Sequence, residues 1–239
     1  MKKFFLIILL IVIYQALNVL FPNHFFPSIW QILTALINNL SEWQFYQHIG
    51  SSLLRILIGF TLAGITGISL GLILAYDQRL KELKLLVELL RPIPPIAWIP
   101  IAIIIFGLGN ASACFIVFLG AFFPIFTNTY FGAISIPVIY KNVASSFEIN
   151  KATYFTKILL FFSLPYIFTG LKIGIGMAWM SVIAAELIAA QSGLGYFIQL
   201  NRLLLQTDNI IIGMIFIGLI GNLLQKLIAF LEKKIIIWN

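Results

Sequence analysis

Charged residues are scarce in this sequence of 239 residues. Asp, Glu, Lys and Arg make up 10% of it, against about 25% in an average globular domain, whereas 61% of its residues are hydrophobic. Because so few charges cannot cover the surface of a water-soluble fold, the composition indicates a protein embedded in a lipid bilayer. The single cysteine, Cys114, lies in an apolar run, which excludes a disulfide within the chain.

Sequence motifs of enzyme active sites are also missing. The sequence has no GxxxxGKS or GxxxxGKT phosphate loop, no GxSxG, no HExxH and no carboxylate pair close in sequence. We therefore expect no catalytic residue, no cofactor and no nucleotide hydrolysis by this chain. His24 and His48 lack the spacing of metal ligands on one helix face, so no metal site is expected. The net charge of +7 is scattered rather than gathered in a stripe, which argues against nucleic-acid binding.

Long apolar runs predict an all-α, polytopic membrane protein with about six transmembrane helices. No repeat or hydrophilic linker marks a second domain. We therefore expect one membrane domain over residues 1–239, in which a first span precedes a five-span core at 52–231. The predicted spans are 4–21, 52–76, 93–107, 112–134, 165–189 and 209–231.

The basic residues indicate the orientation of the chain. With the N-terminus inside, the inner ends of the spans and the inner loops hold twelve of the fifteen basic residues. Since cytoplasmic loops are enriched in Lys and Arg, this bias predicts that both termini are cytoplasmic. The first apolar run could instead be a cleaved signal peptide, but it is longer than a signal core and lacks a small-x-small cleavage site, which favours a retained span. The twelve are Lys2, Lys3, Arg79, Lys81, Lys84, Arg91, Lys141, Lys151, Lys157, Lys226, Lys233 and Lys234.

The outer segment between the first two spans has two possible helix starts. Ser28 with Gln31, and Ser41 with Gln44, both have the spacing of a capping box. Apolar residues then recur at helical spacing, which predicts a helix at the membrane interface. Packing on the bundle is the favoured role for this helix, and a docking surface is the alternative.

Prolines interrupt the third predicted span. In "RPIPPIAWIPIAIIIFGLG", four prolines remove backbone donors, and such breaks persist at membrane depth only where protein buries them or where they line a cavity. A simple kink is the alternative. Elsewhere, the pairs Gly67 with Gly71 and Gly170 with Gly174 have the small-xxx-small spacing of closely packed helices. We expect these glycines to pack helices within one subunit rather than between subunits.

Five stretches in order resemble one family. They are "SLLRILIGFTLAGITGISLGLILA", "RPIPPIAWIPIAIIIFGLG", "GAFFPIFTNT", "SLPYIFTGLKIGIGMAWMSVIAAE" and "SGLGYFI". From about residue 52 to residue 198, the sequence resembles the permease subunits of ABC importers of the nitrate, taurine and aliphatic-sulfonate type. The ordered set is specific to the family, although each stretch alone is a weak signal.

The resemblance implies a function and partners. It implies a type I ABC importer permease in the bacterial inner membrane, working as a homodimer with a pair of ATPase subunits and an extracytoplasmic substrate-binding protein. The solute would be small and polar or anionic: nitrate, a sulfonate such as taurine, bicarbonate or a pyrimidine precursor. Within this reading, the candidates for lining the translocation pathway are Pro94, Pro95, Trp98, Asn128 and Trp179.

The resemblance also implies a role for the cytoplasmic loop at about 138–160. In such permeases this loop carries the EAA motif, whose short helix docks on the ATPase. Ala144 matches that motif, but Glu148 stands where the family has glycine. The expected contacts with the ATPase are Val143, Ala144, Phe147, Glu148, Ile149, Asn150 and Lys151.

The residues of the loop independently predict two short amphipathic helices with a bend. We expect Ala144 and Phe147 to face the partner, with Glu148 at the rim of the contact. Asn150, which is a good helix cap and tolerates a left-handed backbone, could make the turn that glycine makes in the family. The alternative is a helix that lies on anionic lipid through its lysines.

Two charges lie at a shared depth in the membrane. Arg55 is just inside the outer end of the second span, and Glu186 is just inside the outer end of the fifth. Because an unpaired charge there is costly, we expect them to pair and to hold an outer gate, whereas separate snorkelling to the interface is the alternative. Lys172 lies about 21 Å from Glu186 along one helix and therefore cannot pair with it.

Two further functional classes stay open from the residues alone. An ion-coupled secondary transporter would need a relay of intramembrane acids, for which Glu186 alone is thin support. A membrane scaffold without transport is the third possibility. Genes for an ATPase and a secreted binding protein beside this one would favour the importer.

Overall fold

A computed structural model describes residues 14–15 and 27–237 of the chain. Its helices, in chain order, are α2 Ile29–Ser41, α3 Trp43–Tyr76, the 3-10 helix η1 Gln78–Leu80, α4 Lys81–Leu90, the 3-10 helix η2 Pro95–Trp98, α5 Ile99–Phe106, α6 Asn110–Ile134, α7 Val138–Ser146, α8 Lys151–Thr153, the π-helix η3 Tyr154–Leu159, α9 Leu160–Ala189, α10 Leu194–Leu203 and α11 Thr207–Ile235. The described residues contain no β-strand. The predicted all-α class is confirmed.

Four helical segments are long and apolar enough to cross a membrane: α3, α6, the continuous stretch Lys151–Ala189 and α11. The segments Glu82–Leu90 and Pro95–Phe106, bent by 92°, make a fifth if they are counted as one broken span. The predicted span at 4–21 lies outside the described residues except for residues 14–15. The structure is that of a multi-pass membrane protein.

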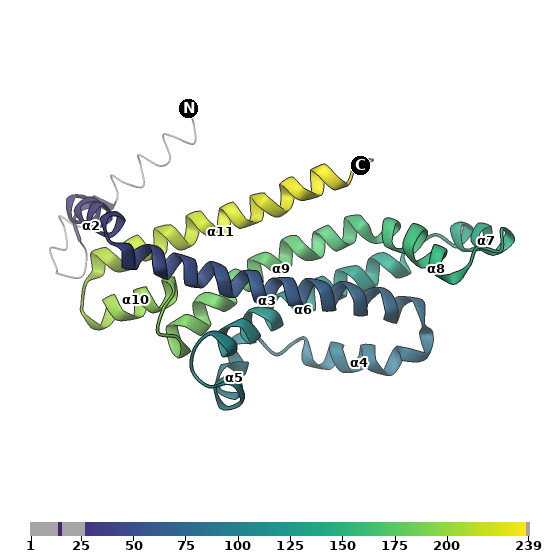
Figure 1. Cartoon of the computed structure of the whole chain (residues 1–239), viewed down its shortest axis with the longest axis horizontal. Helices are drawn as coiled ribbons and strands as arrows, with labels where there is room; N and C mark the ends of the chain where they lie inside the picture. The colour runs from purple at the N-terminus through teal and green to yellow at the C-terminus, as the bar shows by residue number, and fades with distance from the viewer. Residues whose placement is uncertain (1–13, 16–26, 238–239) are drawn as a thin grey trace.

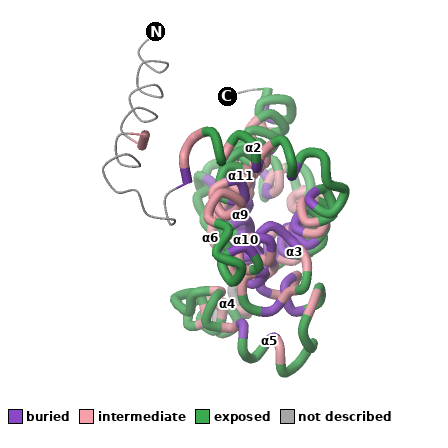
Figure 2. The backbone as a smooth tube through the Cα atoms, turned by 90° about the vertical axis from the view of Figure 1, so that its left-hand side faces the viewer, coloured by how far each residue is buried: buried purple, intermediate pink, exposed green. Residues whose placement is uncertain are grey.

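Helices α3, α6 and α9 run side by side along the long axis of the molecule (Figure 1). Helices α2 and α10 lie at one end, and α7 and α8 lie at the other. Buried residues concentrate where α3, α6, α9 and α10 meet, whereas α4 is largely exposed (Figure 2). The molecule therefore has two ends along its long axis. We call the end at α2 and α10 the outer end, after the orientation that the sequence predicts, and the end at α7 and α8 the tip.

Glycines allow the close approach of the three central helices. A methyl group on Gly67 would meet Ile125 of α6 at 3.1 Å, and one on Gly71 would meet Thr129 at 2.8 Å. Gly170 and Gly174 of α9 contact the same stretch of α6. The predicted packing of both glycine pairs within the subunit is confirmed.

The alanine variant of Gly59 should be destabilised, in contrast to that of Gly50 in the same helix. A methyl group on Gly59 would lie 2.7 Å from the carbonyl oxygen of Cys114 and from Cβ of Val117, so Gly59→Ala should cost about 1–3 kcal/mol. A methyl group on Gly50 meets nothing within 4 Å, so Gly50→Ala should stabilise the protein by about 0.5–1 kcal/mol through helix propensity. Thermal unfolding of the purified variants in detergent checks both signs, and equal shifts would contradict the packing described here.

Prolines break the third predicted span more sharply than a kink would. The sequence predicts one span at 93–107, but a helical axis changes direction by 92° between Leu90 and Pro95. Pro94 has the extended backbone that a residue preceding proline adopts, and Pro95 opens η2 at a position where its missing N–H costs nothing. Amphipathic α4 therefore runs in a different direction from the apolar helix α5.

One of the two predicted helix starts is correct. Ser28 and Gln31 form a reciprocal capping box at the start of α2. The second predicted start is wrong, because Ser41 is the last residue of α2 and its hydroxyl donates to the carbonyl of Ile37 at 2.8 Å. Helix α3 follows after Glu42 without a side-chain cap, so α2 and α3 are joined by a single residue.

Candidate functional site

A buried ion pair joins α3 to α9 near the outer end. Arg55 Nη1 lies 2.7 Å from Glu186 Oε1, and the two side chains are 2% and 0% exposed. The Glu186 carboxylate also accepts hydrogen bonds from Ser52 Oγ at 2.8 Å and from the backbone N–H of Gly195 at 2.9 Å. The structure thus brings together the two charges singled out in the sequence, and neither reaches the surface separately.

The guanidinium of Arg55 donates further hydrogen bonds to Asn110 and Ser192. Its Nε donates to Asn110 Oδ1 at 2.9 Å, Nη1 to the carbonyl of Ser192 at 2.7 Å and Nη2 to the Ser192 hydroxyl at 2.8 Å. These bonds compensate the desolvation of the charge. The pair and these bonds therefore hold four segments, α3, α6, α9 and residues 192–195, in one arrangement.

Glycines bring residues 192–195 against the carboxylate. Gly193 has φ of 109°, a region that only glycine adopts freely, and any Cβ there would overlap the carboxylate of Glu186. Gly195 packs equally closely, since its Cβ would lie 2.5 Å from the carbonyl of Ile183. The pattern "SGLG" after the end of a span was the available signal for this carboxylate-binding segment, and sequence reasoning missed it.

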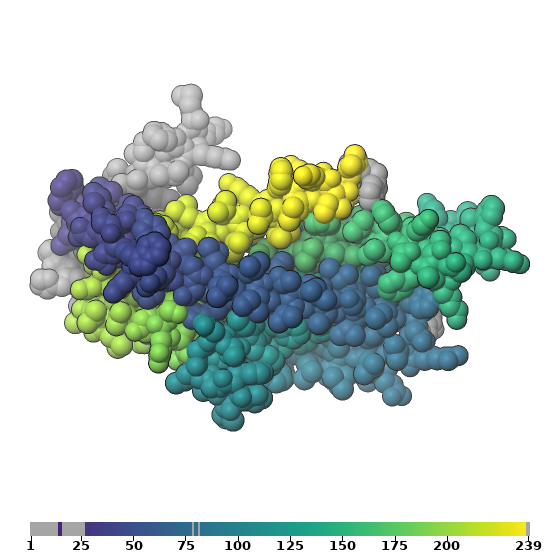
Figure 3. Space-filling view, viewed as in Figure 1, coloured from purple at the N-terminus to yellow at the C-terminus, as the bar shows by residue number. Residues whose placement is uncertain are grey.

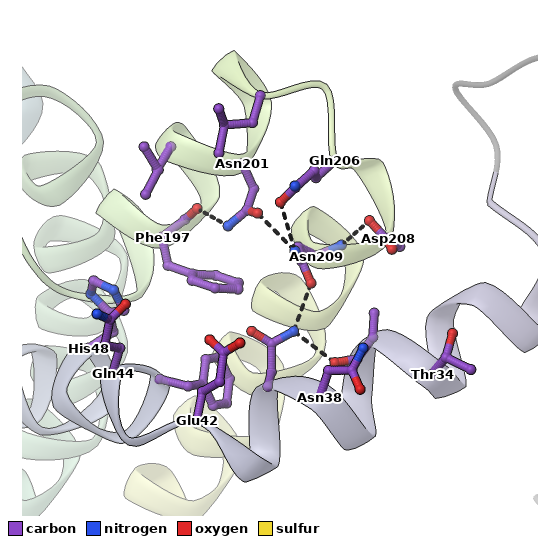
Figure 4. Close-up of a pocket in the computed structure, with 15 residues that line it drawn as sticks. Thr34, Asn38, Glu42, Gln44, His48, Phe197, Asn201, Gln206, Asp208 and Asn209 are labelled. Carbon is purple, nitrogen blue, oxygen red and sulfur yellow. Dashed lines mark hydrogen bonds between the residues drawn. The ribbon is translucent and has the colours of Figure 1, made fainter.

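Polar side chains line a pocket of about 460 Å³ between α2, α3, α10 and α11 (Figure 4). A chain of amides crosses it, from Asn39 to Asn209 at 2.7 Å and from Asn209 to Asn201 at 2.9 Å. His48 also lines this outer pocket, and its Nδ1 accepts a hydrogen bond from the N–H of Gly193 at 3.2 Å. The outer pocket thus adjoins the segment that holds the buried ion pair.

A second ion pair, of two partly exposed side chains, lies toward the tip. Lys172 Nζ of α9 is 2.9 Å from both carboxylate oxygens of Glu232 in α11. The sequence predicts that Lys172 cannot reach Glu186, but Glu232 was not foreseen as its partner. The bond ties the end of α11 to α9.

The loop at the tip turns at Glu148. The N–H of Glu148 donates to the carbonyl of Ser145 and the N–H of Ile149 donates to that of Ala144, both at 3.0 Å. Glu148 has φ of 50°, so it is the left-handed residue of a Schellman motif that ends α7. The expectation that Asn150 could make this turn is wrong. Asn150 instead caps α8, its side chain accepting the N–H of Thr153 at 2.8 Å.

The two residues expected to face a partner point differently. Phe147 is 76% exposed at the end of α7, whereas Ala144 is only 5% exposed. The expectation that Ala144 faces outward is therefore corrected, because its small side chain lies on the buried face of α7. Lys151 and Val143 are also exposed.

Glycine at position 148 should strengthen the turn. A left-handed backbone costs a non-glycine residue roughly 1–2 kcal/mol, so Glu148→Gly should relieve about 1 kcal/mol, whereas Glu148→Val should add strain because its side chain is β-branched. Hydrogen exchange of the Ile149 amide, which closes the motif, measures the effect. Protection should rise with glycine and fall with valine, and the reverse order would contradict the turn.

The five candidates for a translocation pathway do not converge on one cavity. Pro94 and Pro95 lie at the bend before η2, and Trp98 ends η2 with its Nε1 buried and without a partner among the described residues. Asn128 donates to the carbonyl of Pro124 in its own helix at 2.8 Å. Trp179 donates to the carbonyl of Ile217 at 2.9 Å and so joins α9 to α11.

Apolar spanning helices, a proline-broken segment, a buried ion pair at one end and an exposed helical tip at the other are features of a polytopic membrane protein. Residues 67–235 match the family described as binding-protein-dependent transport system inner membrane component. Since this match covers most of the chain, the protein belongs to that family. It is the permease component of an ABC transport system, as the resemblance of the sequence predicts.

Relatives of known name agree with this membership. The chain is 40% identical to the nitrate import permease protein NrtB of Synechocystis sp. over 78% of this chain and 68% of the relative. It is 39% identical to the bicarbonate transport system permease protein CmpB of Synechococcus elongatus, over 82% and 71%. A putative ABC transporter permease protein, MJ0413 of Methanocaldococcus jannaschii, is 40% identical over 79% and 71%. All three are transport permeases rather than enzymes.

Proposed function

We propose that this permease imports a small oxyanion, of the class that includes nitrate and bicarbonate, by alternating access driven by ATP. The observation that carries the proposal is the similarity to permeases named for nitrate and for bicarbonate over more than two thirds of each chain. Two copies of the chain would enclose the pathway between them.

The tip would bind a pair of ATPase subunits. It projects beyond the other helices at one end of the molecule (Figure 3). Phe147 and Val143 are 76% and 47% exposed there, beside Lys141 and Lys151. By the positive-inside rule, these lysines support a cytoplasmic location for the tip, on the side proposed for both termini. An exposed aromatic residue at the end of a projecting helix can anchor in a pocket on a protein partner. This geometry favours docking on a protein over the alternative of a helix that lies flat on the lipid surface.

The outer end would receive the extracytoplasmic binding protein, and the ion pair there would hold the outer gate. Arg55 and Glu186 tie α3 and α9 to the segment that enters α10, so opening this end would require their separation. Since its bonds to Arg55, Ser52 and Gly195 occupy both carboxylate oxygens, Glu186 is poorly placed as a mobile proton relay. The ion-coupled secondary transporter therefore gains no support.

The proposed class of solute can be tested on the substrate-binding protein, because that partner would select the solute. The binding protein encoded beside this permease should bind nitrate, bicarbonate or a related oxyanion in calorimetric titration. Selective binding of peptides or hexoses would contradict the oxyanion and leave the permease assignment intact.

A further inference from the structure

Helix α11 has its polar and apolar faces arranged unlike those of a soluble helix. A stripe of large apolar residues faces away from the bundle: Leu219, Leu223, Leu227 and Phe230, each at least 53% exposed. The polar residues Asn222, Gln225 and Lys226 are also exposed, but they border this stripe and line a groove that α11 forms with α9. In a bilayer, apolar groups belong against lipid, and polar groups face a water-filled or ligand-filled space. The face of α11 toward α9 therefore borders such a space.

That space is a groove of about 730 Å³ between α9 and α11, which we call the inner groove. Met177, Met180 and Trp179 make its apolar wall on α9. Gly176 has no side chain, which leaves room for the Gln225 side chain. A methyl group at position 176 would lie 3.3 Å from the amide nitrogen of Gln225. The inner groove thus combines an apolar wall with a polar one, as small-solute sites do.

The charge in the inner groove is positive. Lys172 lines it, but Glu232 neutralises that lysine at 2.9 Å. Lys226 has no ion pair or hydrogen bond with any residue that the structure describes, and neither do the amides of Asn222 and Gln225. No carboxylate lines the groove. One free ammonium and two free amides on adjacent turns offer donors to an oxyanion.

We propose that the inner groove binds an oxyanion between Lys226, Asn222 and Gln225. Lys226 lies nine residues before the end of α11, about 14 Å along its axis, so the site is near the inner membrane surface. Two sources of the same chemistry reach that depth: the transported solute and the phosphate of an anionic lipid. The inference that this anion is the transported solute rests on the proposed function. The inference that the inner groove binds an anion does not depend on it.

Protection of Lys226 from acetylation tests the site in the full-length purified chain. The reagent is a water-soluble acetylating ester, and the rate at Lys226 is read by peptide mass spectrometry, with exposed Lys234 on the same helix as the internal control. One arm compares sodium nitrate with sodium chloride at equal ionic strength in uncharged detergent. The other compares nanodiscs of phosphatidylcholine with nanodiscs that also contain phosphatidylglycerol.

Bound anion should slow acetylation of Lys226 by about threefold at twice the dissociation constant, without slowing that of Lys234. Asn222→Leu should abolish the protection, whereas Leu227→Ala on the apolar stripe should keep it. Protection by nitrate assigns the site to the solute, and protection by phosphatidylglycerol alone assigns it to lipid. Equal rates in all conditions would overturn the proposal, as would a Lys226 that never reacts, since protein would then fill the groove.

Discussion

Arg55→Met is expected to destabilise the permease by about 3–5 kcal/mol, because it leaves the carboxylate of Glu186 buried beside an uncharged side chain. Glu186→Gln should cost a similar amount, since it leaves the guanidinium unpaired at 2% exposure. Both variants should also fail to hold α10 in place, so uptake should fall with stability. Unfolding of each purified variant in detergent measures the first effect.

The double variant distinguishes a coupled pair from two independent structural residues. Arg55→Met with Glu186→Gln should cost less than the sum of the single changes, because no uncompensated charge is left. Exchanging the two charges is a weaker test than the sequence alone suggests. Ser52 and Gly195 donate to position 186, so an arginine there would meet donors instead of acceptors. Additive single effects would show that the two charges do not act as a pair.

Phe147→Ala should weaken binding of the ATPase subunits by about 2 kcal/mol, roughly 30-fold in the dissociation constant, and should abolish most uptake. Phe147 is largely exposed at the end of α7, so its side chain is available to a partner. Because it packs little within the chain, its removal should act on binding rather than on folding. Co-purification of the ATPase with the tagged permease measures the loss. Membrane insertion and thermal unfolding of the permease alone should stay unchanged.

Trp43→Ala is the matched control for Phe147→Ala. Trp43 is 74% exposed, close to the 76% of Phe147, but it lies at the outer end. It should leave binding of the ATPase unchanged. A loss of the ATPase in both variants, or in neither, would contradict the assignment of the tip. Ala144→Arg is unsuitable as a test of contact, because Ala144 is 5% exposed and the change would disrupt the tip itself.

The sequence predicted the elements whose signal is local or compositional. Apolar runs predicted the spans α3, α6, α9 and α11, Ser28 with Gln31 predicted the start of α2, and glycine spacing predicted the packing of α3, α6 and α9. Arg55 and Glu186 could be linked from 131 positions apart because a charge inside a membrane requires a partner at its own depth.

Other features depend on contacts that the sequence does not encode locally. Ser192, Gly193 and Gly195 surround Glu186 only because the chain folds back after α9, and "SGLG" also occurs in ordinary turns. The left-handed backbone at Glu148 was missed because glutamate rarely adopts it, while Asn150 has the better intrinsic preference. At the tip, the Schellman hydrogen bonds override that preference.

The transport reaction itself tests the account most directly. The permease is reconstituted into proteoliposomes with its ATPase subunits and binding protein, and entry of isotopically labelled nitrate or bicarbonate is measured. Uptake should require ATP on the side of the tip and the binding protein on the opposite side, should persist when ion gradients are collapsed, and should be lost with Phe147→Ala. Uptake that proceeds without ATP and stops when a proton or sodium gradient is collapsed would contradict it.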